Sequence, residues 1–186
     1  MTKFYEYLLA ARYRLTGLRL RLYLRSLGCS VGSNLKCLQF PTFRDIPKGN
    51  FSIGDNVVIG RGVVFEITGS GALEIGDETV IGDYVRFSSI SKIKIGKWVG
   101  IAESCSIRGS THQIKRDRKF MEQGSDGEEV TVGDDVLIGT HSQVLMGAQI
   151  PEGAIIGALS LVTRREKLHP YGIFVGSPVK HIRDRE

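Results

Sequence analysis

The chain has 186 residues, enough for one domain with a sizeable core and short appendages. It contains no apolar run of transmembrane length and no cleavable signal, so we expect a cytoplasmic protein. The formal net charge of +5 belongs to residues 1–28, which carry six basic side chains and one acidic one, while the remaining 158 residues carry nineteen of each sign. The main body is therefore expected to have no nucleic-acid partner.

Residues 1–28 are expected to form a basic amphipathic segment of their own. Apolar residues recur there at spacings of four and three, which predicts one apolar stripe on a helix. The stripe consists of Phe4, Leu8, Ala11, Leu15, Leu18 and Leu22. The stretch LRLRLYLR also alternates with period two, so a strand stays open. Two roles stay open as well: a cap over the end of the main body, or an interfacial helix that touches anionic lipid at the inner face of the membrane.

A six-residue repeat fills residues 29–166. An isoleucine, valine or phenylalanine leads each unit, glycine often follows it, and a small side chain stands four positions after most leads. The leads are Ile53, Ile59, Phe65, Ile75, Ile81, Phe87, Ile95, Ile101, Ile107, Val132, Ile138, Val144, Ile150, Ile156 and Val162. Neither a helix nor a simple strand has a period of six. A hexapeptide period is typical of a parallel β-helix.

Each unit is expected to form one short strand and a corner, with three units in each coil of a triangular prism. Lead and small residues point inward, and successive coils pair as parallel strands about 4.8 Å apart. The glycines are expected to supply corner backbone angles that are closed to residues with a Cβ. Cys105 and Thr111 occupy small inward positions, so Cys105 is expected to be an inert core residue.

The repeat changes phase at three places, each after the third unit of a coil, so all three insertions should project from one corner. The first two are short, at residues 71–74 and 93–94. The third is a polar, charged excursion loop over residues 113–131 whose stem is His112. Loops of this length inside a compact domain are usually functional or disordered.

The repeat fades in residues 167–186, where the chain resembles a known family. The relevant motifs are Val162-Thr163-Arg164, Pro170-Tyr171, Gly176-Ser177-Pro178-Val179-Lys180 and Ile182-Arg183. They resemble the end of the hexapeptide-repeat O-acetyltransferases, which include maltose and galactoside acetyltransferases and polysaccharide O-acetylating enzymes. The resemblance covers about residues 29–185, and the basic N-terminal segment resembles that of members that modify exopolysaccharide and lipopolysaccharide.

The resemblance implies a left-handed parallel β-helix, an all-β fold, that assembles as a homotrimer with active sites between subunits. It implies acetyl transfer from acetyl-CoA to a hydroxyl of a sugar or glycan, as in polysaccharide biosynthesis, with no metal. His112 in Ser110-Thr111-His112 matches the family's general base. A sugar hydroxyl is a poor nucleophile until a group with a near-neutral pKa takes its proton, and direct transfer needs no acyl-enzyme. Glu103 and Asp117 are the candidates for orienting the imidazole.

The resemblance also implies that the donor lies in a groove between subunits beside the late coils. The matching positions are Gly139, Thr140, Ala158, Thr163, Arg164, Lys180 and Arg183. Coil backbone would pair with the amide-bearing pantetheine arm, and the basic side chains suit the nucleotide phosphates. The trimer is expected to be held by the coil faces next to the excursion corner.

Four positions depart from the family pattern. Ser177 stands where asparagine is frequent, and Arg164 stands for lysine and keeps the charge. Gln113 stands where proline often follows the histidine, and Leu137 stands where tryptophan is frequent. Gln113 and Leu137 bear on the acceptor. His141, His169 and His181 are expected to have surface or packing roles.

Three alternatives stay open for the function. The first is N-acetylation of an amino-sugar nucleotide, which would use the same base and donor. The second is a γ-type carbonic anhydrase, which fits less well because catalytic zinc needs three protein ligands and only His112 and His141 lie in the coils. The third is a non-catalytic binding module.

Overall fold

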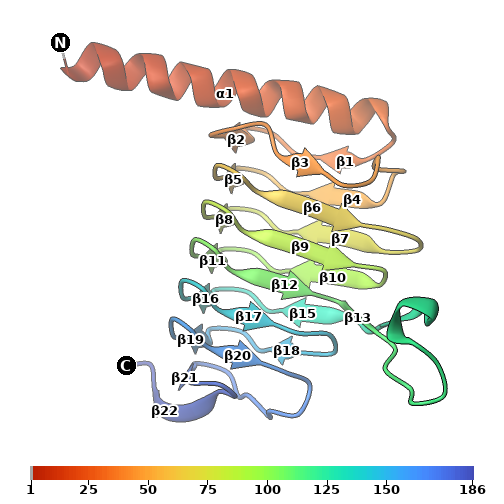
Figure 1. The fold of residues 1–186 in the computed structure, drawn as a ribbon. Coiled ribbons are helices and arrows are strands. Elements are labelled where there is room, and N and C mark those ends of the chain that lie inside the picture. The colour runs from red at the N-terminus through yellow and green to blue at the C-terminus, as the bar shows by residue number, and fades with distance from the viewer. Residues whose placement is uncertain (1) are drawn as a thin grey trace.

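The computed structural model describes residues 2–186, with side chains described from Tyr7 onward. A long helix, α1 (Thr2–Ser26), precedes a column of short strands that stack coil upon coil (Figure 1). Three parallel sheets form the sides of a triangular prism, and each coil contributes one strand to each sheet. The six-residue repeat therefore predicts the architecture correctly.

The strands are distributed over the three sides as follows. Sheet A contains β1 (Ser30–Val31), β4 (Phe51–Ile53), β7 (Ala72–Ile75), β10 (Lys92–Ile95), β15 (Val130–Val132) and β18 (Gln149–Ile150). Sheet B contains β2 (Lys36–Cys37), β5 (Val58–Ile59), β8 (Val80–Ile81), β11 (Gly100–Ile101), β16 (Leu137–Ile138), β19 (Ile155–Ile156), β21 (Gly172–Val175) and the antiparallel β22 (Lys180–Asp184). Sheet C contains β3 (Thr42–Phe43), β6 (Val64–Ile67), β9 (Arg86–Ser89), β12 (Ser106–Arg108), β17 (Gln143–Val144) and β20 (Leu161–Val162).

The coils wind in the left-handed sense. In Figure 1 the chain descends from the N-terminal end, while strands of sheet A run leftward at the back and strands of sheet C run rightward at the front. Parallel strands joined by ordinary crossovers are almost always connected in the right-handed sense, so the expectation of left-handed coils ran against the general rule. The structure confirms the left-handed β-helix.

The interior of the prism is the column of stacked side chains that the repeat predicts. The lead residues are at most 3% exposed, and Phe65 stacks on Phe87 with ring centroids 5.5 Å apart. Apart from Thr111, the small residues four positions on are equally buried, among them Val57, Cys105 and Ala148. Burial of this kind stabilises by about 25 cal/mol per Å² of apolar surface, so the aliphatic stack is the main source of stability.

The glycine that follows many leads has a different role from the one we expected. Its backbone is not in the left-handed region; that conformation falls two residues later, at Asn56, Tyr84 and His141 among others. The glycine is needed instead because neighbouring coils approach closely at this point. A Cβ on Gly60 would lie 2.6 Å from the carbonyl carbon of Gly82 in the next coil.

Aspartates at several corners link one coil to the preceding one. The Asp77 carboxylate accepts a hydrogen bond of 2.9 Å from the Asp55 backbone N–H and forms an ion pair of 2.9 Å with Lys97. Asp83 accepts in the same way from the Arg61 backbone N–H at 2.7 Å. Together these bonds hold the pKa of Asp77 below its ordinary value, and the bond from the Asp55 N–H has a larger effect than the one from Lys97.

Helix α1 lies across the N-terminal end of the prism and covers the open core (Figure 1). It packs through Gly17, Leu20 and Leu24, and the two leucines are fully buried. This is the capping role, but the predicted stripe is not the packing face. Phe4 lies outside the described side chains, Ala11 is exposed, and the other stripe members are 47–60% exposed, namely Leu8, Leu15, Leu18 and Leu22.

The outward side chains differ among the three faces. On sheet B they form an apolar ladder that runs through Val58, Val80, Gly100, Leu137, Ile155 and Ile173. On sheet A the corresponding ladder is polar and contains Ser52, Glu74, Lys94, Thr131 and Gln149. Among the described residues, no helix is long and apolar enough to cross a membrane.

Candidate active site

The excursion leaves the prism earlier than the phase predicts. Strand β13 (Ser110–His112) turns away from sheet C and pairs antiparallel with β14 (Ser125–Gly127), so that His112 lies opposite Ser125. Thr111 is consequently exposed, and the expectation that it points into the core was wrong. The cause is the polar Ser110-Thr111-His112 run, which gains a hairpin partner outside the prism.

Hydrogen bonds fix the stem of this hairpin around His112. The Gln113 backbone N–H donates to the Gly124 carbonyl at 2.9 Å, and the Gln113 side chain donates to Asp126 at 2.7 Å. Farther out, the short 3-10 helix η1 (Phe120–Glu122) brings the Phe120 ring to 6.1 Å from the His112 ring, edge to face. His112 is thus presented from an ordered stem while its ring remains exposed.

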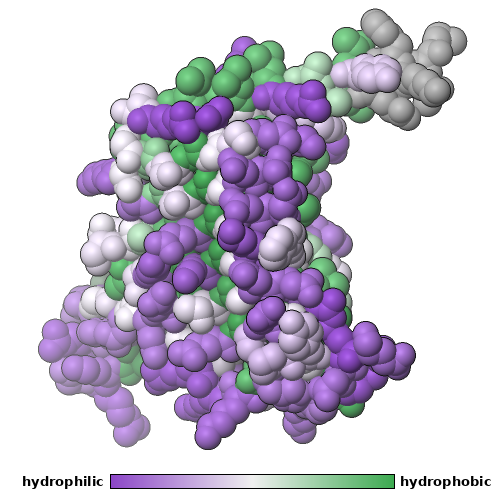
Figure 2. Space-filling view, turned by 180° about the vertical axis from the view of Figure 1, so that it is seen from behind, coloured by the Kyte–Doolittle hydropathy of each residue, from purple (hydrophilic) through white to green (hydrophobic). Residues whose placement is uncertain are grey.

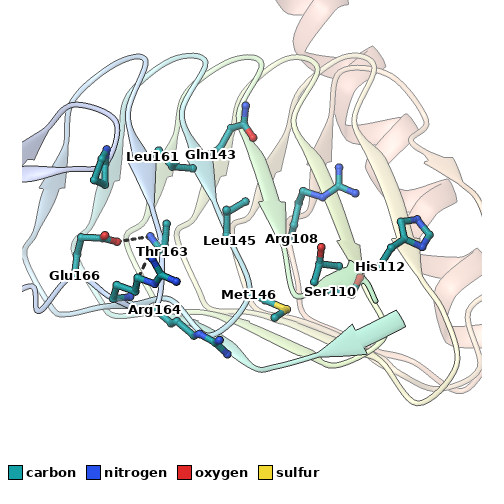
Figure 3. Close-up of a pocket in the computed structure, with 13 residues that line it drawn as sticks. Arg108, Ser110, His112, Gln143, Leu145, Met146, Leu161, Thr163, Arg164 and Glu166 are labelled. Atoms are coloured by element: carbon teal, nitrogen blue, oxygen red, sulfur yellow. Dashed lines mark hydrogen bonds between the residues drawn. The ribbon is translucent and has the colours of Figure 1, made fainter. Parts of the chain in front are cut away.

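A cavity of about 700 Å³ lies on the outside of sheet C, beside this stem. Figure 3 shows His112 at one end of it and Thr163, Arg164 and Glu166 at the other. The side chains between them are Gln143 and Leu161, from the outer face of sheet C, together with Leu145 and Met146. The cavity is long and open, which suits an extended ligand.

The far end of the cavity is held by hydrogen bonds and an ion pair. The Thr163 backbone N–H donates to Glu166 at 2.7 Å, and Arg164 pairs with Glu128 at 3.0 Å. Glu128 comes from the base of the excursion, so this pair joins the excursion to the late coils. The Arg164 side chain still exposes 57% of its surface, which leaves it accessible to an anionic ligand.

His112 also borders a smaller hollow of about 190 Å³ on the side of the earlier coils. Glu66, Ser88 and Ser125 contribute polar groups to it. Partial burial of Glu66 is the largest single influence and opposes its ionisation. The hydrogen bond of 2.8 Å from Arg86, the charge of Arg86, a hydrogen bond with Ser88 and the charge of Arg44 together outweigh it and keep the pKa of Glu66 below its ordinary value. His112 therefore stands between a long cavity and a compact polar hollow.

Arg108 lines both hollows and was not foreseen from the sequence. It is exposed and forms no ion pair with a described residue. One signal was available: Arg108 directly follows the lead Ile107, where many other units have glycine. A side chain at that position must leave the prism, here toward His112 (Figure 3).

Neither candidate for orienting His112 lies beside it. Glu103 sits at the corner between sheets B and C. A hydrogen bond with its own backbone has the largest effect in lowering the pKa of Glu103, followed by a hydrogen bond with Thr140 and the charge interaction with His141. Asp117 is paired with Arg118 within the excursion at 3.2 Å. Within the described residues, the His112 ring has no hydrogen-bond partner, so its orientation must come from the stem or from a ligand.

The predicted donor residues fall into three groups within one subunit. Thr163 and Arg164 line the long cavity with His112. Gly139, Thr140 and Ala158 form a separate group at the corner between sheets B and C, across the width of sheet C. Lys180 and Arg183 lie exposed on β22 at the C-terminal end. A single subunit therefore does not bring all seven to one place.

The other three histidines lie away from the long cavity. Thr140 and the His141 ring are hydrogen-bonded at 2.7 Å, at a different corner of the prism from His112, so His112 and His141 of the same subunit do not share a metal. His169 and His181 each lie 2.8 Å from the same Asp184 oxygen on the C-terminal surface, a set that satisfies its own hydrogen bonds and is also of a type that can hold a cation.

The cysteines are unreactive by placement. Cys105 is 1% exposed, and burial raises its pKa. Burial raises the pKa of Cys37 to about 11. A thiol whose pKa lies that far above neutrality is not a nucleophile at physiological pH.

Relatives of the chain are acyl-transferring proteins. No protein-family model matches it. It is 32% identical to the dTDP-4-amino-4,6-dideoxy-D-glucose acyltransferase of Escherichia coli, over 84% of this chain and 82% of that protein. It is 29% identical to the putative lipopolysaccharide biosynthesis O-acetyl transferase WbbJ of Escherichia coli strain K12, over 81% and 79% of the two chains. A shorter match, 42% identical over 57 residues, spans about a quarter (26%) of a Morganella morganii chloramphenicol acetyltransferase and 31% of this chain.

Solved structures share the fold. AntD, an N-acyltransferase from Bacillus cereus in complex with dTDP and 3-hydroxybutyryl-CoA, superimposes with a TM-score of 0.73 at 23% identity, over 89% of this chain and 88% of that one. A maltose O-acetyltransferase from Clostridium difficile 630 gives a TM-score of 0.56 at 23% identity, over 96% and 89%. At these identities the likeness is one of fold.

Proposed function

This chain belongs to the hexapeptide-repeat acyltransferase family, and from that premise we propose that it transfers an acetyl group from acetyl-CoA to a hydroxyl of a sugar or glycan. One observation carries the proposal: His112 stands on a hydrogen-bonded stem between the long cavity and the compact polar hollow. A donor can lie in the long cavity while an acceptor occupies the polar hollow. The imidazole then faces the point where the two reactants meet.

The long cavity suits a CoA thioester. It is elongated, and Leu145, Met146 and Leu161 give it an apolar wall for the pantetheine arm. Thr163 and Arg164 at its far end offer hydrogen-bonding and cationic groups. The complex of AntD with an acyl-CoA supports this assignment, because that protein has the same fold.

His112 acts as a general base in the proposed reaction. The neutral imidazole accepts the proton of the acceptor hydroxyl while the oxygen attacks the acetyl carbonyl carbon. The new C–O bond forms, the C–S bond breaks, and the imidazolium returns its proton to the departing CoA thiolate. The products are an acetyl ester and CoA, and no acyl-enzyme is needed, which agrees with the burial of Cys29, Cys37 and Cys105.

A homotrimer completes the site in this proposal. The donor residues at the corner between sheets B and C lie away from His112 in one subunit, so a neighbouring subunit would have to bring its own corner to the cavity. In a threefold ring each interface joins two different surfaces. The apolar outer ladder of sheet B would pack beside the excursion corner of the next subunit. Light scattering at working concentration tests this: a trimer is expected, and a monomer would contradict it.

N-acylation of an amino-sugar nucleotide is the second candidate. It is favoured by the 32% identity to an acyltransferase whose name specifies a dTDP-amino sugar. The ionised Glu66 in the polar hollow could also hold an ammonium group before its deprotonation.

An acceptor panel tests both candidates. Release of CoA from acetyl-CoA is followed with a thiol reagent, and the product is identified by mass, for matched acceptors that differ only in a hydroxyl or an amine. Turnover of hydroxyl acceptors with an alkali-labile product supports O-acetylation. Turnover restricted to amines supports the second candidate. If neither class accelerates CoA release above hydrolysis, the proposed function is wrong.

A further inference from the structure

Helix α1 has two apolar faces, and the prism uses only one of them. Leu20 and Leu24 are fully buried against the first coil. Leu22 is two residues from each, about 200° around the helix, and therefore points away from the prism. It is 60% exposed. A cap for the core needs the inner face alone, so the outer face requires a separate explanation.

The outer face is a continuous stripe. Leu8, Leu15, Leu18 and Leu22 are spaced by seven, three and four residues, which aligns them along one side of a helix. They are 53%, 52%, 47% and 60% exposed, respectively. Seen from behind, apolar surface forms the upper edge of the molecule along α1, with hydrophilic surface directly beneath it (Figure 2).

Arginines border the stripe on both sides. At 100° per residue, Arg12 and Arg19 flank it on one side, and Arg14 and Arg25 flank it on the other. Residues 7–26 contain five arginines and no acidic residue. Arg12, Arg14 and Arg19 are exposed and form no salt bridge with a described residue. Their charge is available to an anionic partner.

The position of α1 allows a flat partner to approach. The helix lies across one end of the prism (Figure 1). The stripe is on the side of the helix opposite the buried Leu20 and Leu24, so it faces away from the prism. The coils and the excursion lie below it, so no other described part of the chain obstructs the stripe. In a ring of subunits with parallel prism axes, the stripes would face the same way.

We propose that the outer face of α1 binds the surface of an anionic lipid bilayer. The leucines would enter the boundary between headgroups and acyl chains, and Arg12, Arg14 and Arg19 would contact lipid phosphates, whereas Arg25 donates to the Val31 carbonyl of the first coil. A second copy of the chain is a poorer occupant, because two such faces would place rows of arginines against each other. This surface is separate from the site of acyl transfer.

Vesicle co-sedimentation of the full chain tests the proposal. Vesicles of phosphatidylcholine alone are compared with vesicles that also contain phosphatidylglycerol, at low and high salt. We expect binding to the anionic vesicles that weakens as salt rises, because screening shortens the reach of the arginine charges. The double change Leu15→Glu and Leu18→Glu should weaken binding at least about tenfold, since it places carboxylates where the apolar side chains would enter the bilayer.

Matched controls separate this effect from damage to the fold. Leu159→Glu makes the same change at a leucine that is 73% exposed in a late coil, and it should bind vesicles as the wild type does. The thermal midpoint and the molar mass of each variant are measured in parallel. Absence of binding by the wild type, or equal binding by the double variant, would overturn the proposal. So would a fall in molar mass of the double variant without any vesicle binding, which would assign the face to a subunit contact.

Discussion

His112 is set apart from the other histidines by its surroundings. It lies on an antiparallel stem between two hollows, whereas His141 is engaged with Thr140, and His169 and His181 share Asp184. The phase break marked His112 as the stem of the excursion, and the family resemblance implied its role as the base. The neighbouring contacts could not be predicted, because the excursion has no repeat to define its register.

Substitution of the proposed base gives the clearest effect on chemistry. His112→Ala should lower the rate of acetyl transfer by a factor on the order of 10²–10⁴, the usual contribution of a positioned general base. CoA binding and molar mass should be unchanged, because His112 is exposed and makes no core contact. The measurement is steady-state CoA release with a saturating acceptor.

His141→Ala is the matched control for this substitution. Its ring is also exposed, but it lies at another corner of the prism. The rate should stay within a few-fold of wild type if its role is local packing. Full activity of the His112 variant, or an equal loss in both variants, would show that His112 is not the base.

Asp77 makes the stability of the prism depend on pH. The pKa of Asp77 in the folded protein lies below its ordinary value. Its contribution to the free energy of unfolding is therefore fully present at a pH above the ordinary pKa, and it is lost as the pH falls through the pKa of the folded state. The thermal midpoint of the wild type should therefore fall below about pH 4. Asp77→Asn should have a lower midpoint at neutral pH and a smaller acid-induced fall, so the two curves converge at low pH. Parallel curves would contradict this role.

The repeating elements were more predictable than the appended ones. The lead positions specify a buried column, and the structure buries them as predicted. The glycines were located correctly, but their physical role was missed, because close approach between coils depends on a neighbour twenty or more residues away. For α1 the helix was predicted and its packing face was not. The exposed stripe is the more regular of its two apolar faces, and burial through Gly17 carries no hydrophobic signal.

Coil spacing gives a prediction at the level of the element. Gly60→Ala should destabilise the protein by about 1–3 kcal/mol, because the new methyl group would overlap the backbone of the next coil and force the strands apart. Gly124→Ala is the control, since a Cβ there would meet nothing closer than 3.9 Å. Chemical denaturation of both variants provides the comparison. Equal stability of the two would show that the coils can adjust without cost.

The whole molecule places its proposed reactive groups on different corners of one prism. His112 and Arg164 lie along the long cavity, while Gly139 and Ala158 lie across sheet C at another corner. Within a monomer these groups do not line the same cavity. In a ring, the corner of one subunit can meet the cavity of the next and complete the site. The family resemblance suggested the ring, and the separation of the donor residues gives a structural reason for it.

Acetyl transfer by a mixture of two inactive variants tests this arrangement most directly. His112→Ala removes the base, and Ala158→Trp blocks the donor corner at an exposed position. When the two are unfolded and refolded together, random threefold rings should contain intact sites formed from one subunit of each kind, restoring about a quarter of wild-type activity. Each variant refolded alone should remain inactive. If the mixed rings form and activity does not return, His112 and the donor corner do not act across a subunit interface.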